Sequence, residues 1–528
     1  VVCVVYEFRG IPMMAPDILT VQTATSVMGN YTFKLTFEQY SVILVCMAFF
    51  FTFLRLHEVK VTEKRVFHIA GFIVVALGCG LFTNQIILSD FMDEHQINIR
   101  MFRPMESYQK YGGVLTFARS VGYAVVKKPE GYTTAKVDQI IQEYEKKSAN
   151  EQQSTAKQYP NIITVVNETF ADIKVLGDFK TNEDYMPYFH SLKKNCVTGY
   201  TYASIVGGQT ANTEFELLTG NTLGFLSAGT TAFQLYIHGQ MPSLVSNLKA
   251  EGYSGNKAMH PFNPYNYNRP AVYKDFGFTD FIDKFDFPKN VKRVREYISD
   301  EANVDRIISE YEKNRKKTDQ PFYMYNMTIQ NHSPYDKDAA NFKQPIKIES
   351  SKYDAEANRY LNLIKYSDDS LKQLTSYFEK CKEPTIILFL GDHQPRLTDE
   401  FMNKITNGQY QTWSSEQMMK RYQVPFVIWA NYDIKEQHIE KTSMNYIQSI
   451  LTKTAGVKMT GYQRFLNEVR KEVPTITSQG YWGKNGKFYQ INDKGSPYYG
   501  IIQKYRMIQY NMMFDKKNRR DSFFEVSK

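Results

Sequence analysis

Apolar and charged residues divide the chain into regions of different character. Two stretches near the start, residues 40–54 and 66–88, contain no Asp, Glu, Lys or Arg. A helix needs about 20 apolar residues to cross a bilayer. The second stretch has that length, and the first reaches it with the preceding residues 35–37. The pattern predicts two membrane-spanning helices, over about 35–54 and 66–88.

The short segment between these two helices is basic. Residues 55–65 contain four Lys and Arg, and cytoplasmic loops carry an excess of such residues. We therefore expect this segment in the cytoplasm and the chain after Leu88 outside the cell. Val1–Tyr6 resembles the end of an earlier helix, so residues 1–89 are predicted to form a truncated transmembrane region of a multi-pass cell-membrane protein. Buried core helices of a soluble protein are the alternative.

The pattern changes again on either side of the middle of the chain. Residues 137–147 repeat apolar positions at helical spacing and precede a polar run over 148–157, which predicts a helical stalk and linker over 90–158. After about Val473 the chain is rich in Gly, Tyr, Lys and Asn. We expect residues 473–528 to form a small C-terminal appendage, a hairpin and a helix.

Between these regions, residues 159–472 alternate short apolar runs with amphipathic stretches. The predicted strands are residues 162–166, 322–329, 385–390 and 425–429, and the predicted helices are residues 210–218, 304–313, 357–378 and 443–452. Alternation over about 300 residues predicts an α/β domain with a doubly wound, mostly parallel sheet flanked by helices.

Composition removes several classes of function. The five cysteines form no Cys-x-x-Cys motif, so neither a zinc ribbon nor a disulfide scaffold is indicated. The net charge of +9 suits an anionic membrane surface or a polyanionic product, and equally an ordinary basic surface. The chain has no nucleic-acid-binding motif, and we expect no nucleic-acid partner.

Acidic and imidazole side chains follow two of the predicted strands. Asp392 and His393 come directly after the apolar run that ends at Leu390, and Glu168 follows the first predicted strand. The carboxyl ends of parallel strands meet at one edge of a sheet, where α/β proteins keep their chemistry. Asp and His side by side are half of a divalent-metal site, and Glu168 could complete it. The alternative is that Glu168 caps the following turn.

A threonine stands where the next helix begins. Gly207 and Gly208 permit a tight backbone, and Thr210 then falls in the first helical turn. A hydroxyl there lies in the positive field of exposed N–H groups, which favours an alkoxide or a bound phosphate. An ordinary Thr N-cap, with Glu214 supporting the first turns, is the alternative.

Two further loops offer groups that suit a phosphate with a polyol attached. The first, residues 257–269, contains His260, Tyr267, Asn268 and Arg269, which supply hydrogen-bond donors and aromatic surface. A lone histidine is usually structural or merely exposed. His332 is different because it follows a predicted strand, as Glu168 and Asp392 do.

Together these segments resemble a known family, the lipoteichoic acid synthases and related phosphoglycerol transferases of the alkaline phosphatase and sulfatase superfamily. The resemblance spans about residues 160–450. It rests on five motifs in the family's order: Asn167-Glu168-Thr169-Phe170, Gly208 to Phe215, His260 with Tyr267-Asn268-Arg269, Asn331-His332-Ser333-Pro334-Tyr335, and Gly391 to Pro395. Five ordered motifs are far more specific than any one of them.

The resemblance implies a sulfatase-like extracellular domain and a reaction. One divalent cation, Mn²⁺ or Mg²⁺, would be bound by Glu168, Thr210, Asp392 and His393. Thr210 would attack the phosphorus of phosphatidylglycerol and expel diacylglycerol, and an acceptor on a glycolipid, teichoic acid or glycan would then take the glycerol phosphate. His332 would contact substrate and assist proton transfer.

The same resemblance implies that His260, Tyr267, Asn268 and Arg269 bind substrate, with His260 and Arg269 holding its phosphate and glycerol. Two positions depart from the family's pattern. The family has Lys before the nucleophile and Trp before Asn-Arg, whereas Gln209 and Tyr267 stand here. Neither change removes a metal ligand, but both affect the substrate pocket. The pattern therefore supports catalysis better than it identifies the acceptor.

Other classes of protein remain open at this point. A true sulfatase needs Cys or Ser within Cys/Ser-x-Pro-x-Arg, and neither Cys196 nor Cys381 has that context. A phosphoethanolamine transferase, or another phosphodiesterase or sulfatase-like hydrolase, also uses metal, and the scarcity of cysteine argues against the transferase. The third alternative is an inactive, membrane-anchored module that binds its ligand without turnover.

Overall fold

The structure is a computed structural model. It describes Met13, Ala15 and residues 37–56, 65–88, 91–94, 104–124, 126–148, 158–227, 230–349 and 355–526. The chain divides into two compact units. The first comprises Val1–Lys127 with Ser227–Thr230, and the second comprises Lys128–Leu226 with Thr231–Lys528.

Helices form over both apolar stretches of the first unit. The helices of this unit are α3 (Phe37–Leu56), α4 (Arg65–Phe82), a π-helix (Thr83–Leu88), α5 (Phe91–Glu94), α6 (Pro104–Tyr111) and α7 (Gly113–Ala124). Within the described part of the chain, one helical stretch, Ile69–Ile87, is long and apolar enough to cross a membrane, while α3 contains the shorter apolar stretch Ile43–Thr52. Of the two predicted spans, the second is therefore supported by length and composition. The predicted earlier helix end at Val1–Tyr6 lies outside the described residues.

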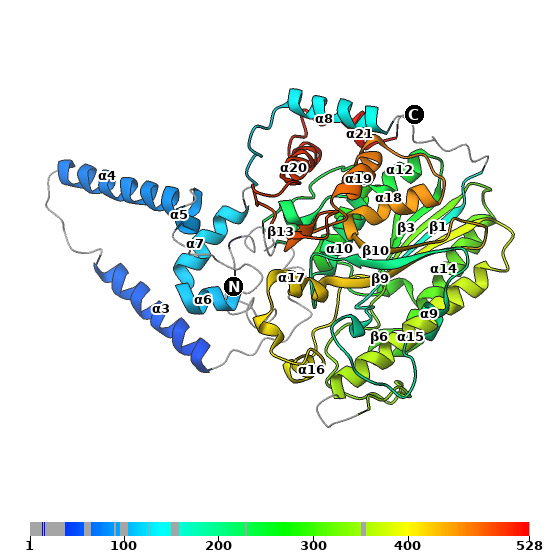
Figure 1. Cartoon of the computed structure of the whole chain (residues 1–528). Helices are drawn as coiled ribbons and strands as arrows, with labels where there is room; N and C mark the ends of the chain where they lie inside the picture. The colour runs from blue at the N-terminus through cyan, green and yellow to red at the C-terminus, as the bar shows by residue number, and fades with distance from the viewer. Residues whose placement is uncertain are drawn as a thin grey trace. The chain divides into compact units, whose positions relative to one another are not determined.

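The second unit is built on an eight-stranded sheet (Figure 1). In spatial order the strands are β10 (Gln437–Ser443), β2 (Cys196–Tyr202), β9 (Gln423–Ala430), β8 (Thr385–Gly391), β1 (Asn161–Asn167), β7 (Phe322–Met327), β3 (Ser254–Met259) and β4 (Asp280–Ile282). β9 runs antiparallel to both of its neighbours, and the remaining pairs are parallel. The predicted mostly parallel α/β sheet is confirmed, with one reversed strand.

Helices cover both faces of this sheet (Figure 1). One face carries α10 (Thr210–Thr219), α12 (Leu244–Ala250), α18 (Met444–Thr454) and α19 (Gly461–Glu472), and the other carries α9 (Pro187–Ser191), α14 (Asp300–Arg315) and α15 (Ala355–Phe378). Strands β1 and β8 are buried along their whole length, as expected for central strands with helices on both sides.

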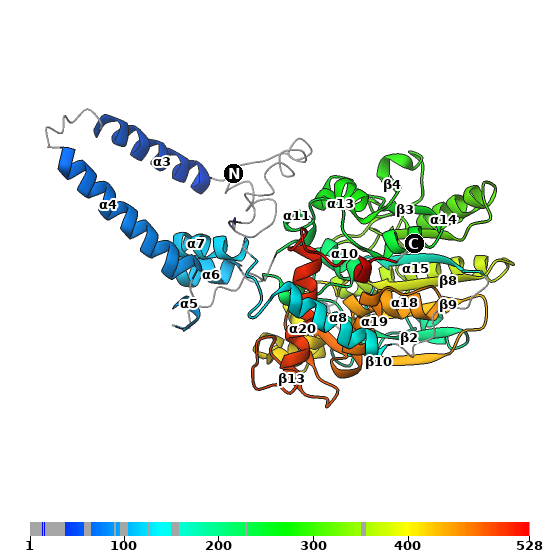
Figure 2. The same ribbon diagram turned by 90° about the horizontal axis from the view of Figure 1, so that it is seen from above.

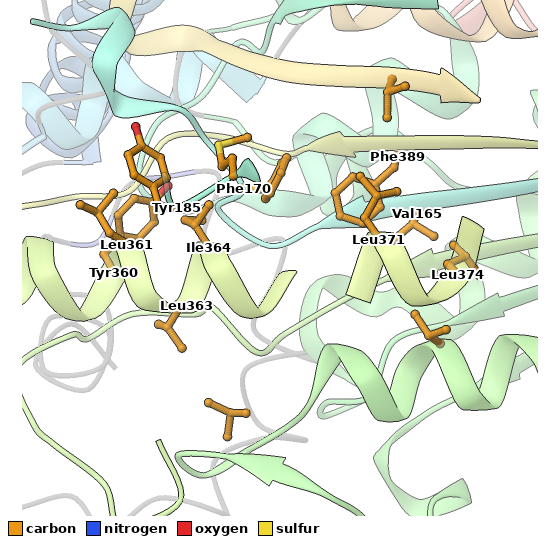
Figure 3. Close-up of a cluster of buried hydrophobic side chains, with 14 of the residues drawn as sticks. Val165, Phe170, Tyr185, Tyr360, Leu361, Leu363, Ile364, Leu371, Leu374 and Phe389 are labelled. Atoms are coloured by element: carbon orange, nitrogen blue, oxygen red, sulfur yellow. The ribbon is translucent and has the colours of Figure 1, made fainter. Parts of the chain in front are cut away.

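Alternate residues of the central strands build the core beneath α15. Val165 and Phe389 pack with Leu371 and Leu374 of that helix (Figure 3). Apolar positions recur at helical spacing along α15, so one side of this helix lies on the sheet. This packing fixes the positions of β1 and β8 relative to α15, and therefore where the C-terminal ends of these strands lie.

The end of the chain packs on the second unit. A small antiparallel sheet of β11 (Thr475–Thr477), β12 (Gly480–Trp482) and β13 (Phe488–Tyr489) precedes α20 (Tyr499–Met513) and α21 (Asp521–Phe524). Helix α8 (Thr134–Lys147), within the expected stalk region, lies against α19 and α20 (Figure 2). The Tyr144 ring lies 4.6 Å from that of Phe465, and Lys504 pairs with Glu143 at 2.7 Å.

A close approach of two chain segments determines the geometry where β8 ends. A Cβ atom placed on Gly391 would lie 1.8 Å from the carbonyl oxygen of Phe170, in the segment that follows β1. Only glycine permits this separation, so Gly391 lets the ends of β1 and β8 come together.

Replacing Gly391 with Ala should lower the free energy of unfolding by about 1–3 kcal/mol or more, because the new methyl group meets rigid backbone. Chemical denaturation followed by fluorescence can measure this, since the three tryptophans, Trp413, Trp429 and Trp482, all belong to the second unit. Gly408→Ala is the matched control, because nothing lies within 4 Å of its Cβ position, and its effect should stay within about 0.5 kcal/mol. Equal stability of the two variants would contradict this account of Gly391.

Candidate active site

The ends of β1 and β8 bring three potential metal ligands together. Glu168 follows β1, and Asp392 and His393 follow β8. The Nε2 atom of His393 lies 3.2 Å from Asp392 Oδ2 and 3.8 Å from Glu168 Oε1. One ligand atom from each residue lies within 4.8 Å of the others, and no other such group of three occurs among the described residues.

Local hydrogen bonds leave the right atoms of this cluster open for a cation. Asp392 Oδ1 accepts from the backbone N–H groups of Thr169 (2.7 Å) and His393 (2.8 Å). His393 Nδ1 lies 3.0 Å from the carbonyl oxygen of Gln394, which favours a proton on Nδ1 and a lone pair on Nε2. Asp392 Oδ2 and His393 Nε2 are fully buried and have no hydrogen-bond partner. Buried polar atoms of this kind need a partner, and these two suit a divalent cation.

The electrostatics of the cluster lead to the same conclusion. Burial, and next the neighbouring Asp392 carboxylate, raise the pKa of Glu168 well above its usual range. Two ionised carboxylates at this spacing in a buried site repel each other. A divalent cation would remove that repulsion, and a carboxylate, imidazole and hydroxyl donor set fits Mn²⁺ or Mg²⁺.

Thr210 joins the cluster from α10. It is the first helical residue, and its hydroxyl donates to Glu168 Oε2 at 3.4 Å. The N-cap position belongs to Gln209, which has a left-handed backbone (φ 65°) and makes no side-chain capping bond. A non-glycine residue in this conformation costs on the order of 1 kcal/mol. The alternative of Thr210 as an ordinary N-cap is therefore wrong, and so is that of Glu168 as a turn cap, because its carboxylate faces Thr210 and His393.

His332 lies in the loop that follows β7, and an arginine holds this loop in place. The guanidinium of Arg295 donates to the carbonyl oxygens of Gln330 and His332, both at 2.8 Å, and of Pro334 at 2.7 Å. His332 Nδ1 lies 2.7 Å from the carbonyl oxygen of Ser333. Burial lowers the pKa of His332, so the ring is neutral near pH 7 and its Nε2 can accept a proton.

His260 follows β3 and is buried. Its Nδ1 atom lies 3.0 Å from the carbonyl oxygen of Met327, and burial lowers the pKa of His260 well below its usual value. A neutral ring whose Nδ1–H is engaged offers an acceptor at Nε2. His260 therefore suits a hydroxyl group of a ligand better than a phosphate.

Arg269 is held by a residue whose role the sequence did not reveal. Its Nε and Nη2 atoms donate to Glu214 Oε1 at 3.0 and 2.6 Å, and both side chains are buried. Glu214 lies on α10, one turn after Thr210, and also accepts from the hydroxyls of Tyr273 and Tyr325. The ion pair thus ties Arg269 to the helix that carries Thr210, instead of Glu214 merely supporting its own helix.

The two remaining substrate-side residues precede Arg269 directly. Tyr267 and Asn268 are half-buried, and both have left-handed backbones, with φ of 59° and 58°. The Tyr267 ring lies 5.2 Å from the guanidinium carbon of Arg269. The loop therefore presents the three side chains from one tight turn at the start of α13 (Arg269–Phe276).

Sequence reasoning missed Glu214 and Arg295 as supporting residues. Glu214 occupies a position typical of an exposed helix residue, and Arg295 lies in the turn between the two-residue strands β5 (Arg293–Val294) and β6 (Tyr297–Ile298). Neither has a local signal, because both act through partners more than 30 residues away.

The fold and the strand-end cluster define the class: an α/β protein of the alkaline phosphatase and sulfatase superfamily. Residues 160–457 match the sulfatase family model, and the chain belongs to this family. The predicted membership among lipoteichoic acid synthase-like proteins is confirmed by the family match and by curated relatives.

Two curated relatives illustrate the range of the family. The chain is 30% identical over 433 residues to a putative cyclic beta-1,2-glucan modification protein of Rhizobium meliloti, covering 80% of this chain and 65% of that protein. It is 24% identical over 374 residues to the lipoteichoic acid synthase of Staphylococcus saprophyticus, covering 68% of this chain and 55% of that protein. The chain thus spans less than two thirds of the length of either relative.

Solved structures share the fold. The phosphoglycerol transferase GacH of Streptococcus pyogenes, in complex with sn-glycerol-1-phosphate, superposes with a TM-score of 0.61 at 20% identity, covering 76% of this chain and 100% of that chain. The lipoteichoic acid synthase LtaP of Listeria monocytogenes gives a TM-score of 0.52 at 19% identity, covering 74% and 98%. At these identities the likeness concerns the fold alone.

Mn²⁺ should raise the midpoint of thermal unfolding of the protein, because a ligand at 100 times its Kd stabilises the folded state by about 2.7 kcal/mol. His393→Ala removes the buried Nε2 ligand and should abolish most of this shift in differential scanning fluorimetry. His238→Ala, which changes an exposed histidine, should keep it. An undiminished shift for His393→Ala would rule out this cluster as the cation site.

A second buried carboxylate of α10, that of Glu216, binds this helix to residues before and after it in the chain. Glu216 Oε1 accepts from Ser204 Oγ at 2.7 Å and from the Leu223 N–H at 2.8 Å, while Oε2 is buried without a partner. Burial raises the pKa of Glu216 to about 7. The folded protein therefore keeps a proton here that the unfolded chain releases near pH 4.5.

The free energy of unfolding should consequently fall as pH rises from about 4.5 to 7, by on the order of 3 kcal/mol from this group alone. Glu216→Gln mimics the protonated form and should remove that part of the pH dependence. Denaturation curves at pH 5 and pH 8 measure the difference. Parallel pH profiles for the parent and the variant would show that Glu216 titrates normally.

Proposed function

We propose that this protein transfers glycerol phosphate from phosphatidylglycerol to an acceptor hydroxyl, with Thr210 as the nucleophile and one Mn²⁺ or Mg²⁺ ion. The carrying observation is the position of the Thr210 hydroxyl, 3.4 Å from one oxygen of Glu168, whose other oxygen faces the unpartnered His393 Nε2. This places a hydroxyl at the start of a helix and beside a cluster that fits a cation.

Four residues hold the ion in this proposal: Glu168, Thr210, Asp392 and His393. When bound, the cation lowers the pKa of the Thr210 hydroxyl and polarises the phosphoryl group. The backbone N–H groups at the start of α10 favour the negative charge that develops on the phosphoryl oxygens.

The reaction has two displacements at phosphorus. In the first, Thr210 Oγ1 forms a bond to phosphorus and the bond from phosphorus to the diacylglycerol oxygen breaks, so that Thr210 loses a proton and diacylglycerol gains one. In the second, the acceptor oxygen bonds to phosphorus and the bond to Thr210 Oγ1 breaks. Neutral His332 accepts the proton of the incoming hydroxyl at Nε2, and that proton then passes to Thr210 Oγ1, so both residues return to their starting state.

The proposed substrate-binding residues act in two ways, by charge toward the phosphate and by hydrogen bonding toward the glycerol. Arg269, held by Glu214, contributes a positive charge of fixed position near the phosphate, and Tyr267 and Asn268 line the same turn. His260 accepts a hydroxyl of the glycerol moiety at Nε2. These assignments use each side chain as its local hydrogen bonds orient it.

The acceptor and the cellular setting are proposed from the relatives. The name of the Rhizobium relative points to a glucan, and the name of the staphylococcal one to lipoteichoic acid, so the acceptor is a glycan or a glycerophosphate-bearing glycolipid. A lipid donor requires the catalytic unit to work at a membrane. We place it outside the cell, anchored by membrane-spanning helices that include Ile69–Ile87.

Thr210→Ala should reduce diacylglycerol release from phosphatidylglycerol by roughly a thousandfold or more, because the proposed covalent intermediate forms on the Thr210 hydroxyl. Lipid products of the full chain in detergent with Mn²⁺ can be quantified by mass spectrometry. Thr210→Ser, which keeps a hydroxyl, should retain measurable release. Both variants should unfold at nearly the parent temperature, and undiminished release by Thr210→Ala would refute the covalent mechanism.

A further inference from the structure

A buried aspartate that has not been described so far is hydrogen-bonded to residues next to the candidate active site. Asp300 is the first residue of α14 and is 1% exposed. Its Oδ2 atom accepts from Asn167 Nδ2 at 2.7 Å, from Ser367 Oγ at 2.6 Å and from Gln330 Nε2 at 3.4 Å. Its Oδ1 atom is buried and accepts no hydrogen bond from the part of the chain that the structure describes.

Two of the donors to Asp300 come from the ends of β1 and β7, and the third, Ser367, lies on α15. Asn167 is the last residue of β1 and immediately precedes Glu168. Gln330 lies two residues before His332, in the loop after β7. Thr328 lies close enough to Asp300 to lower the pKa of that carboxyl group, and its Oγ1 accepts the backbone N–H of Glu168 at 3.0 Å. One carboxylate therefore gathers polar groups next to Glu168 and next to His332.

Asn331 links the residues around Asp300 to Glu168. Its Nδ2 group lies 3.1 Å from Asn167 Oδ1, 3.0 Å from the carbonyl oxygen of Glu168 and 2.8 Å from Ser367 Oγ. Gln330 Oε1 in turn accepts the backbone N–H of Asp300 at 3.0 Å. The result is a closed set of bonds that spans β1, β7, α14 and α15.

We infer that Asp300 is a positioning residue that sets the place of Glu168 relative to His332, so that the cation site and the proton acceptor keep one separation. The inference rests on the proposed function for the role of His332, and on the cluster geometry alone for Glu168. Asp300 touches neither substrate nor cation in this account and acts through Asn167, Thr328 and Asn331.

A purely stabilising role would be an inefficient use of a carboxylate. Burying a carboxyl group is costly, burial raises the pKa of Asp300, and one of its oxygens has no partner. An apolar side chain would fill the space at lower cost but could not align amide and hydroxyl donors from two strands. Groups that orient metal ligands from behind commonly change metal affinity or activity 10- to 100-fold when they are removed.

The test compares Asp300→Asn with a variant that exchanges donor and acceptor, Asp300→Asn combined with Asn167→Asp. In the single variant a neutral amide oxygen replaces the carboxylate oxygen that accepts from Asn167, Ser367 and Gln330, so these bonds weaken and hold the end of β1 less firmly. In the exchanged pair, the carboxylate at position 167 can accept from both the new amide and Asn331. Glu310→Gln is the matched control, because Glu310 is a buried carboxylate on the same helix whose partners are Lys257, Arg306 and Lys313.

We expect Asp300→Asn in the full chain to weaken Mn²⁺ binding, measured by isothermal titration calorimetry, by roughly tenfold or more, and to lower kcat for diacylglycerol release at saturating Mn²⁺ by a similar factor. The exchanged pair should recover most of both losses, and Glu310→Gln should leave both within about twofold. Recovery by exchange is an outcome that a general loss of stability would not produce.

If Asp300→Asn does not fold, Ser367→Ala tests the same network, since it removes one donor while the Asp300 carboxylate keeps Asn167 and Gln330 as donors. It should weaken Mn²⁺ binding by roughly threefold, in the same direction. Unchanged Mn²⁺ affinity and kcat in Asp300→Asn or Ser367→Ala, or no Mn²⁺ binding by the parent protein, would overturn the inference. Mn²⁺ binding without diacylglycerol release by the parent would instead refute the proposed function, and the affinity comparison would still decide the role of Asp300 toward Glu168.

Discussion

The repulsion between two buried carboxylates, Glu168 and Asp392, is the constraint around which the catalytic unit is built. Each follows the end of a central strand, and both lie near one imidazole, that of His393, whose Nε2 atom is 3.8 Å from Glu168 Oε1 and 3.2 Å from Asp392 Oδ2. Such a pair in a buried site is stable only with a shared proton or a cation. The unpartnered Asp392 Oδ2 and His393 Nε2 favour the cation.

The rest of the unit keeps these carboxylates close despite their repulsion. Parallel pairing of β1 with β8 aligns Asn167 with Gly391, and the missing side chain of Gly391 allows the Phe170 carbonyl to approach. The hydroxyl of Thr213 donates to the backbone oxygen of Asp392 at 2.8 Å, which ties α10 to the end of β8. Thr210 lies on the same helix, so this bond also holds Thr210 close to the cluster.

The sequence was sufficient for the parts of the fold that have strong local patterns. Strands β1, β7, β8 and β9 are apolar and central, and the predicted positions agree with the structure to within two residues. The prediction missed β2, β3 and β10 because their sequences contain polar residues and glycine, as in the edge strand Gln437–Ser443. Such strands form because neighbouring strands pair with them, which is information that no local window holds.

The candidate site shows the same division. Residues at strand ends, such as Glu168, Asp392 and His332, could be found because position after an apolar run is a local property. Asp300 could not, because Ser299 and Asp300 have the pattern of an ordinary helix start, where an acidic residue is expected in solvent. Its burial depends on α15 and on the ends of two strands that are distant in the sequence.

The most direct test of the central claim is anomalous diffraction at the manganese edge from crystals of the catalytic protein grown with Mn²⁺. The account predicts one strong peak within bonding distance of Glu168, Thr210, Asp392 and His393. A peak elsewhere, a second ion of equal strength beside the first, or no peak at saturating Mn²⁺ would contradict the claim that a single cation at these strand ends activates Thr210.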